Sequence, residues 1–457
     1  MKHHLIIVAA VLVIANSCPA APVYWFGTVG GSTEGGPGTW DTANNHFSTS
    51  QSGPADTPWN NTSNPGDPVF EGTAGTVIVS SITNNGTLTD NSGYTFQNST
   101  LTLGPSSAVN VTGANNLTVG GSLVLAGGPL TKNGSGTLLL ASSNGHTYTN
   151  NTVLNGGTLA LGSGTGANLG ANGAGNHLVI NADGVTLAQR STTGRSPQAA
   201  VDQLHDLIFD NGVSGASANI QFTLAQGYWK VNGSRKITAL ANTGGGVLVI
   251  GTTTGGATTD RIVDYNGNGT ASWTFDSPGT VSISCDNDIA GGVTISAGTV
   301  RVPDNILYPF GSGTLTLGGG SLATTFNRGT TPITNSISIT QNGTITTSSG
   351  TANTNINFIL SGIISCTSGK VLTFTGNTPA NQAFSPGLSG GFSYVGQVAV
   401  VNNGGATTLQ LLNTTGNDQT FADVITGTGG INRSASTAGT GGNTIMNAAN
   451  TYSGGTT

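Results

Sequence analysis

The feature that most constrains this chain is an internal repeat. Residues 128–162 read GPLTKNGSGTLLLASSNGHTYTNNTVLNGGTLALG, and residues 429–457 restart the pattern as GGINRSASTAGTGGNTIMNAANTYSGGTT. Both segments begin with Gly-[Pro/Gly]-[Leu/Ile]-x-[Lys/Arg], and HTYTNNTV in the first corresponds to NTYSGGTT in the second. Repeats of this size build stacks of coils that bury one another's apolar faces, and such solenoids usually act through their surface rather than by catalysis.

Short segments with alternating apolar and small polar residues run from Val69 onward, among them TVIVSS, STLTLG and GTLLLA. Alternation puts Leu and Val on one face and Thr and Ser on the other, and Asn-Gly pairs supply tight turns. A sandwich or antiparallel barrel has similar short strands, but the repeat favours a parallel stack. We predict an all-β fold, a right-handed parallel β-helix or solenoid over residues 69–457. The inward leucines of the repeat should stack on neighbouring coils: Leu138, Leu140, Leu159 and Leu161.

The repeat resembles the autotransporter-associated β-strand repeat of secreted bacterial passenger proteins. That family's pattern is Gly-Gly-Leu-x-Lys-x-Gly-x-Gly, alternating Leu/Thr, Asn-Thr-Tyr-x-Gly-x-Thr, then Gly-Thr-Leu-x-Leu. Residues 128–162 match it well over 35 residues, whereas the second copy reads Ser434, Ala435 and Ser436 in place of Gly-x-Gly and is truncated at 450–457. The resemblance implies a surface passenger, followed by an outer-membrane β-barrel or a sorting signal, so a truncated product or fragment is expected.

The latter half of the repeat has a further partner. Residues 291–322 align with residues 150–187: each has a Gly-Thr-[Leu/Val]-x-[Leu/Val] strand, a turn with a Leu-Gly or Phe-Gly step, and another alternating strand. The repeating unit is therefore larger than one coil.

Composition narrows the class of protein. Charged residues make up 7% of the chain, against ~25% in ordinary soluble domains, and 73 of the 457 residues are glycine. A net charge of −6 with abundant β-branched residues indicates ordered β-structure rather than disorder. With 12 Lys and Arg in all, nucleic acid is not an expected partner.

Residues 1–20 have the features of an export signal. Lys2 precedes an apolar run from Leu5 to Ala15, which is too short to span a membrane, and Ala20 ends a small-residue cleavage motif. Cys18 raises the alternative of a lipidated cysteine, but Ala15 stands where lipoprotein signals usually have Leu. We expect an exported protein, extracellular or at the cell surface (outer membrane), without a transmembrane helix. Any membrane attachment would come through a missing C-terminal region.

Residues 21–68 should form an N-terminal cap. This stretch is dense in proline and lacks the Thr-Leu-x-Leu pattern; Glu34 lies within it and Glu71, the other glutamate of the chain, lies shortly after it. A solenoid end needs bulk to cover its core, and three tryptophans supply it: Trp25, Trp40 and Trp59. The alternative is an aromatic platform that stacks on sugars.

Residues 190–275 interrupt the rhythm and hold half of the basic residues. Ser196 and Pro197 suit a helix start, and the apolar spacing from Val201 to Ile208 suits a short helix. The run LHDLIFDN fits a strand equally well. An insertion with a functional role would lie here, since insertions in a repeat stack map to one face.

Catalytic candidates are few. Polysaccharide-cleaving β-helix enzymes group carboxylates with cations on one strand face. Here Asp286 and Asp288 occupy alternate positions of CDNDIAG without an adjacent Lys or Arg, which is more typical of turns. Neighbouring coils would have to bring these two, or Asp264, beside Lys230 or Arg261 to complete a site. We assign no catalytic, cofactor-binding or metal residues and expect no enzyme.

Metal sites are weakly indicated. Asp264, Asn266, Asn268 and Gly269 resemble the first half of a calcium loop, but Phe275 holds the twelfth position, where a bidentate Glu belongs. A tandem turn is the favoured interpretation, and calcium binding stays open. The mature histidines lack zinc spacing: His46, His146, His177 and His205.

The mature chain has two cysteines, Cys285 and Cys366. They lie several coils apart in a regular stack, beyond the ~7 Å Cα separation that a disulfide tolerates. We expect two buried thiols.

The function favoured by the sequence is a non-enzymatic exported solenoid, the passenger or stalk part of a bacterial surface protein, for surface display or adhesion. Its partners would be carbohydrates or proteins at cell surfaces or in the extracellular space. The rival is a β-helix that binds or cleaves polysaccharides, which would need clustered carboxylates and cations in a groove.

Overall fold

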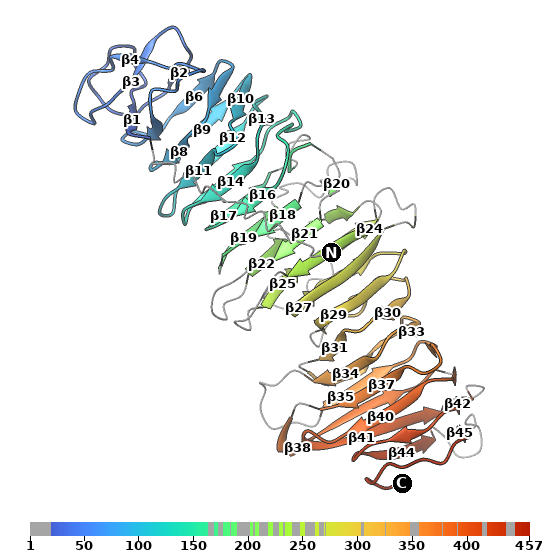
Figure 1. Ribbon diagram of the computed structural model, residues 1–457. Helices are drawn as coiled ribbons and strands as arrows, with labels where there is room; N and C mark the ends of the chain where they lie inside the picture. The colour runs from blue at the N-terminus through green and yellow to red at the C-terminus, as the bar shows by residue number, and fades with distance from the viewer. Residues whose placement is uncertain are drawn as a thin grey trace, which may run out of the picture.

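The chain folds into an elongated stack of β-coils, from the blue N-terminal strands to the red C-terminal ones (Figure 1). The computed structural model describes residues 20–162, 271–302, 306–324, 326–347, 356–376, 378–390, 392–413, 418–435 and 444–457. Between 163 and 270 it describes 169–171, 177–182, 184–189, 202–203, 206–209, 218–222, 228–231, 234–239, 247–251, 261–264 and 269. No helix occurs among these residues. The expected all-β solenoid is confirmed.

Each coil contributes strands to up to three faces, here called A, B and C, and each strand pairs in parallel with the strand on the same face of the next coil. Face A begins with β5 (Asp67–Phe70), β8 (Thr87–Asp90), β11 (Ala108–Val111), β14 (Leu130–Asn133), β16 (Thr152–Leu154), β18 (His177–Ile180), β21 (Asp206–Phe209) and β24 (Ser234–Ala239). Face B begins with β6 (Thr76–Val79), β9 (Thr95–Gln97), β12 (Asn116–Gly120), β15 (Thr137–Leu140), β17 (Thr158–Leu161), β19 (Thr186–Gln189), β22 (Ala218–Phe222) and β25 (Val247–Gly251).

Two long strands then run through the corner between A and B. The first part of β27 (Ser272–Ser284) pairs with β24 and its last part with β25. β29 (Val293–Val302) stacks on β27 with a register shift near Asp276 and pairs with one strand of each face beyond it. Faces A and B are therefore continuous here.

Beyond β29 the faces separate again. Face A continues with β30 (Leu315–Leu317), β33 (Ile337–Ile339) and β36 (Ile364–Cys366), and then with a separate sheet of β39 (Phe392–Tyr394), β42 (Gln419–Phe421) and β45 (Thr444–Met446). Face B continues with β31 (Ser321–Thr324), β34 (Gly343–Thr347), β37 (Val371–Thr375), β40 (Gln397–Val401) and β43 (Ile425–Thr426).

Face C consists of three separate sheets along the stack. The first holds β7 (Ile82–Asn84), β10 (Thr100–Leu103) and β13 (Val124–Gly127). The second holds β20 (Asp202–Gln203), β23 (Tyr228–Val231), β26 (Arg261–Asp264) and β28 (Asp286–Asp288). The third holds β32 (Arg328–Ile333), β35 (Ile356–Leu360), β38 (Thr378–Leu388), β41 (Gly404–Asn413) and β44 (Gly430–Ala435).

Apolar columns fill the interior. Leu138 of β15 pairs with Leu117 on one side and Leu159 on the other, and Leu159 pairs with Leu187. Leu140 and Leu161 are likewise opposite each other. These side chains are buried, so the predicted stacking of the repeat leucines is confirmed.

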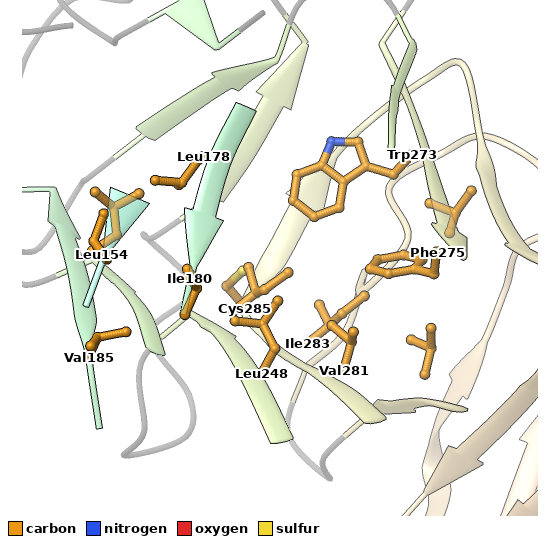
Figure 2. Close-up of a cluster of buried hydrophobic side chains, with 14 of the residues drawn as sticks. Leu154, Leu178, Ile180, Val185, Leu248, Trp273, Phe275, Val281, Ile283 and Cys285 are labelled. Carbon is orange, nitrogen blue, oxygen red and sulfur yellow. The ribbon is translucent and has the colours of Figure 1, made fainter. Parts of the chain in front are cut away.

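Figure 2 shows the same arrangement farther along, where Leu178 and Ile180 of β18, Leu248 of β25 and Ile283 of β27 converge in the core. Alternation explains the packing, because every second residue of a strand points inward. Burying such side chains away from water is the main force that holds successive coils together.

The first coil is closed by a different structure. β1 (Pro22–Trp25) pairs antiparallel with β3 (Asn45–Ser48), which pairs antiparallel with β4 (Thr57–Pro58), while β2 (Gly38–Trp40) joins face B. The rings of Trp40 and Trp59 meet edge to face at 4.9 Å, and Trp25 packs 5.3 Å from Phe70. All three tryptophans are buried. The rings therefore cover the core end as predicted, and as buried rings they cannot form a sugar-stacking platform.

Several local expectations need correction. The helix suggested from Ser196 to Ile208 is wrong where it is described: Asp202–Gln203 and Asp206–Phe209 are strands β20 and β21. Residues 196–201 and 204–205 lie outside the described residues. Between 190 and 275 strands β20 to β26 continue the parallel ladders of the stack. The division into signal, cap and solenoid at 20 and 68 remains a prediction, and the proposed export signal is undescribed up to residue 19.

The cysteines follow the expectation only in part. Cys285 and Cys366 do not form a disulfide. Cys285 is buried, and in Figure 2 it lies beside Leu248 in the core. Cys366, however, is only half-buried at the end of β36, where the strand's inward alternation ends.

We predict that Leu159→Ala destabilises the stack locally by about 2–5 kcal/mol, because it removes buried methyl groups and leaves a cavity between Leu138 and Leu187. Hydrogen exchange should show lost protection in β15, β17 and β19 with little change in distant coils, since contacts are nearest-neighbour. Val153→Ala, a half-buried change on the outer side of β16, is the matched control. A loss of protection spread evenly over the chain would contradict the prediction.

Candidate functional site

The residues that define the repeat motif lie at the joins between coils. Lys132 of β14 faces inward, between Val109 and Leu154 in the neighbouring coils, and is completely buried. Its Nζ donates to three backbone carbonyls: Asn133 at 2.6 Å, Gly134 at 2.9 Å and Gly156 at 3.2 Å. Burial lowers the pKa of Lys132 to about 8, so the ammonium form still predominates at neutral pH and its three N–H groups match the three acceptors.

The same corner also has a ladder of amides. Asn155 donates to the Oδ1 of Asn133 at 2.9 Å, and Asn181 donates to the Oδ1 of Asn155 at 2.9 Å. Gly134 has φ = 75°, a left-handed conformation that suits glycine. The Lys-Asn-Gly run of the motif is therefore a corner in which one cation and stacked amides tie successive coils together.

The His-Thr-Tyr run forms a second join. His146 is buried, and its Nδ1 accepts from the backbone N–H of Leu125 at 3.1 Å in the preceding coil. Burial lowers the pKa of His146 to about 4, so the ring is neutral at physiological pH. Tyr148 is buried too, and its hydroxyl bonds to the Thr152 Oγ1 at 2.8 Å. The sequence analysis assigned no zinc role to His146, and in the structure its ring links one coil to the next.

The segment that aligns with the latter half of the repeat, residues 291–322 and the strand before it, reuses this geometry with other residues. Ile289 stands where the alignment places Tyr148, and the glycines that follow in the next turn are equivalent: Gly170 approaches Tyr148 and Gly311 approaches Ile289, both with positive φ. A side chain at either glycine would meet the facing residue at under 3 Å. Asn287, in place of His146, donates its Nδ2 to the carbonyl of Pro309 at 2.6 Å. The Leu-Gly and Phe-Gly steps of the sequence are thus close contacts between coils.

The acidic candidates lie on the second sheet of face C. Its register places Asp286 opposite Arg261, Asp288 opposite Val263, and Lys230 opposite Asp202. Opposite charges therefore do come to neighbouring positions, as the sequence analysis required for a composite site. However, Asp286 is buried, and its Oδ1 accepts the backbone N–H of Tyr308 at 2.8 Å. This carboxylate shapes a turn of the next coil, whereas Asp288 is exposed.

A groove opens next to this edge. It has a volume of about 480 Å³ and is lined by residues from three successive coils, including Asp288, Tyr308, Ser312, Thr334 and Ser336. Tyr308 is 54% exposed. Of the residues that line the groove, the sequence analysis singled out Asp288 alone, because the others are far apart in the sequence. The sequence feature that could have indicated the groove is Tyr308 in the turn LYPFG, where the first copy of the repeat has GANLG.

The calcium alternative fits the structure poorly. Asp264 ends β26, while Asn266 and Asn268 lie outside the described residues. The positions corresponding to the end of the loop lie within β27: Phe275 is buried in the core, and Asp276 forms an ion pair with Lys236 at 2.5 Å. Among the described residues no group of three or more His, Cys, Asp or Glu is arranged to hold a metal ion.

The other histidines are dispersed. His46 has its Nδ1 2.9 Å from the carbonyl of Phe26, and its ring stacks on Trp25 at 4.9 Å. His177 starts β18, where its backbone N–H is bound by Asn151, and His205 lies outside the described residues.

The two glutamates of the chain, 37 positions apart, meet in the N-terminal cap. Gln51 donates to one oxygen of Glu71, Asn91 donates to the other at 2.8 Å, and Glu34 shares a hydrogen bond with the same carboxylate. Burial, together with the bond to Glu71 and its charge, raises the pKa of Glu34 to about 7. Burial tends to raise the pKa of Glu71 as well, but the bonds from Gln51, Asn91 and Glu34 lower it overall. Sequence reasoning placed both glutamates near the cap and missed the pair.

Comparison with known families identifies the repeat. The model of the passenger-associated-transport-repeat family matches residues 130–161 and 277–302. The first segment is β14 to β17, two consecutive turns over faces A and B, and the second spans most of β27 through β29. The chain thus carries this autotransporter-associated repeat, and the resemblance seen at residues 128–162 is confirmed. The restart at 429–457 is not among the matched segments.

A curated relative points the same way. The adhesin BmaC autotransporter of Brucella suis biovar 1 (strain 1330) is 34% identical to this chain over 221 residues, which are 47% of this chain and 6% of that protein. The chain therefore spans only a small part of that relative's length. No solved structure matches significantly. In the part of the chain that the structure describes, no helix is long and apolar enough to cross a membrane.

We predict that Lys132→Met destabilises the corner between β14 and β15 by roughly 2–4 kcal/mol, because the methionine leaves the carbonyls of Asn133, Gly134 and Gly156 without their donor. Amide exchange of β14 to β17 would report the loss. Lys370→Met is the control: among the described residues its Nζ bonds to Gln341 alone, at the surface, so the change should stay within about 0.5 kcal/mol. Equal effects of the two substitutions would contradict the assigned role of Lys132.

We also predict that the cap loses stability as the pH rises from about 5 to 8. The pKa of Glu34 is raised in the folded chain, so between its ordinary value of 4.5 and about 7 the folded cap holds a proton that the unfolded chain releases. Thermal unfolding followed by the fluorescence of the cap tryptophans would measure this slope. Glu34→Gln should flatten it, because an amide donates to Glu71 without titrating, whereas Asp56→Asn should leave it unchanged. An unaltered slope in Glu34→Gln would refute the assignment.

Proposed function

We propose that this chain, built around two passenger-associated transport repeats, is the exported rod of a bacterial surface protein and that it serves display and adhesion without catalysis. The observation that carries the proposal is that the motif residues lie in the interior and hold the coils together. Lys132, His146 and Tyr148 are all buried and bond within or between coils. The repeated residues therefore serve to stack the coils, and the outer faces of the rod are left for contacts that can vary.

The relative supports the choice of adhesion. It is named an adhesin and an autotransporter, and the identity extends over nearly half of this chain. Extracellular carbohydrates or proteins at cell surfaces are the proposed partners. The predicted export signal and the passenger repeat both fit a location at the cell surface or outer membrane.

A catalytic function is the second candidate, favoured by the registered pairs Arg261–Asp286 and Lys230–Asp202 on face C. Polysaccharide cleavage requires an acid and a base on either side of the bond. Asp286 is occupied by the backbone N–H of Tyr308, and Asp288 is the one carboxylate that lines the adjacent groove. We therefore favour binding over cleavage.

Microspheres coated with residues 21–457 should adhere to epithelial cells or extracellular matrix more than microspheres coated with serum albumin. Soluble chain should compete with the adhesion, and heat-unfolded chain should not, because the binding surface depends on the folded stack. Adhesion equal to that of albumin-coated microspheres on every surface would refute the adhesive role.

The purified chain should release no reducing ends or unsaturated products from pectin or related polysaccharides. Product formation that Asp288→Asn abolishes, with the fold intact by circular dichroism, would establish the catalytic alternative instead.

A further inference from the structure

We propose that the groove beside β28 is a glycan-binding site in which one sugar ring lies on the exposed face of Tyr308. The inference rests on the proposed adhesive function and names the ligand class and the residues that would serve it. Its basis is the combination of an exposed, anchored aromatic ring with outward-facing hydroxyl and carboxylate groups from neighbouring coils.

Tyr308 is held by its backbone. Its N–H donates to the buried Oδ1 of Asp286 at 2.8 Å, and its carbonyl accepts from the N–H of Asn287 at 2.8 Å and of Gly311 at 3.3 Å. These bonds join the turn to the preceding coil, so the ring emerges from an ordered base. An aromatic side chain on an anchored backbone can offer a large apolar face, and only its two side-chain torsions remain to be ordered on binding.

The buried amide of Asn335 holds the third of the three coils that line the groove. Its Nδ2 donates to the carbonyls of Gly311 at 2.9 Å and Gly313 at 2.7 Å, which joins the coil of Thr334 and Ser336 to the coil of Tyr308. The groove is therefore preformed by contacts between coils, as is usual for small-molecule sites of ~300–1,000 Å³.

The polar groups on its rim have no partner in the described chain. The side chains of Asp288, Ser312, Thr334 and Ser336 are exposed and make no hydrogen bond with any described residue. Three hydroxyls that both donate and accept, next to one carboxylate acceptor, match the donors and acceptors of a sugar. The apolar C–H face of a pyranose fits the tyrosine ring, and its hydroxyls fit this rim.

Charge narrows the ligand class. The residues that line the groove include one acidic side chain, Asp288, and no Lys or Arg, so an acidic sugar would meet a carboxylate without a balancing cation. A neutral or N-acetylated hexose oligomer avoids that repulsion. A second hollow, of about 550 Å³ between Asn327 and Leu412, is lined by amides, aliphatic groups and one hydroxyl without an aromatic ring, and we do not assign it a ligand.

The test is direct binding of the full chain to cellohexaose, mannohexaose, chitohexaose and trigalacturonate, measured by isothermal titration calorimetry. At least one neutral oligomer should bind, and trigalacturonate should not. Tyr308→Ala should weaken binding roughly tenfold or more, whereas Tyr308→Phe should stay within about threefold, because the ring and not the hydroxyl makes the stacking contact. Leu307→Ala, an exposed neighbour outside the groove, is the control for the turn itself.

Equal thermal stability of the three variants would confirm that the turn is intact. No binding of any neutral oligomer, or full binding by Tyr308→Ala, would overturn the proposal. Microsphere adhesion separates this proposal from the adhesive function on which it rests. Cell adhesion by a chain that binds no neutral oligomer would disprove the proposed glycan site and leave the adhesive function standing. Oligosaccharide binding without cell adhesion does the reverse.

Discussion

The structure depends on one constraint: the backbone groups of each strand are satisfied by the strands of the coils before and after it. Parallel ladders in register bring equivalent positions of successive coils to within ~4.8 Å of one another. A leucine at an inward position therefore meets another leucine, as Leu138 meets Leu159. A charge repeated at the same position would meet a like charge at that spacing, which accounts for a chain in which only 7% of residues are charged.

Two inward charged side chains, Asp90 and Lys132, are tolerated because each bonds to backbone groups of nearby turns. Asp90, fully buried at the end of β8, accepts the N–H groups of Ser92, Gly93 and Tyr94, while Lys132 at the end of β14 donates to three carbonyls. One corner is thus organised around a carboxyl group and another around an ammonium group. In both cases a single side chain satisfies backbone groups that a sharp turn would otherwise leave unpaired in the core.

What the sequence predicted well was what recurs within a coil. Alternation identified the strands, and the density of tryptophan identified the cap, since both signals are local. Contacts between coils could not be predicted from the sequence, because they depend on how many residues each turn contains. Glu34 and Glu71 meet through the irregular cap, and the groove draws Asp288, Tyr308 and Thr334 from three coils. The ambiguity of LHDLIFDN between helix and strand was resolved only by pairing with β18 and β24.

The continuity of β27 across a corner bears on how the rod withstands tension. Pulling along the stack loads the hydrogen bonds between coils along their own direction, so the ladders of faces A and B would open one coil at a time. At β27 a single strand of 13 residues belongs to both ladders and is stacked on β29 in the same way. The two faces must part together there, which makes this region a mechanical clamp between the N-terminal and C-terminal halves of the rod.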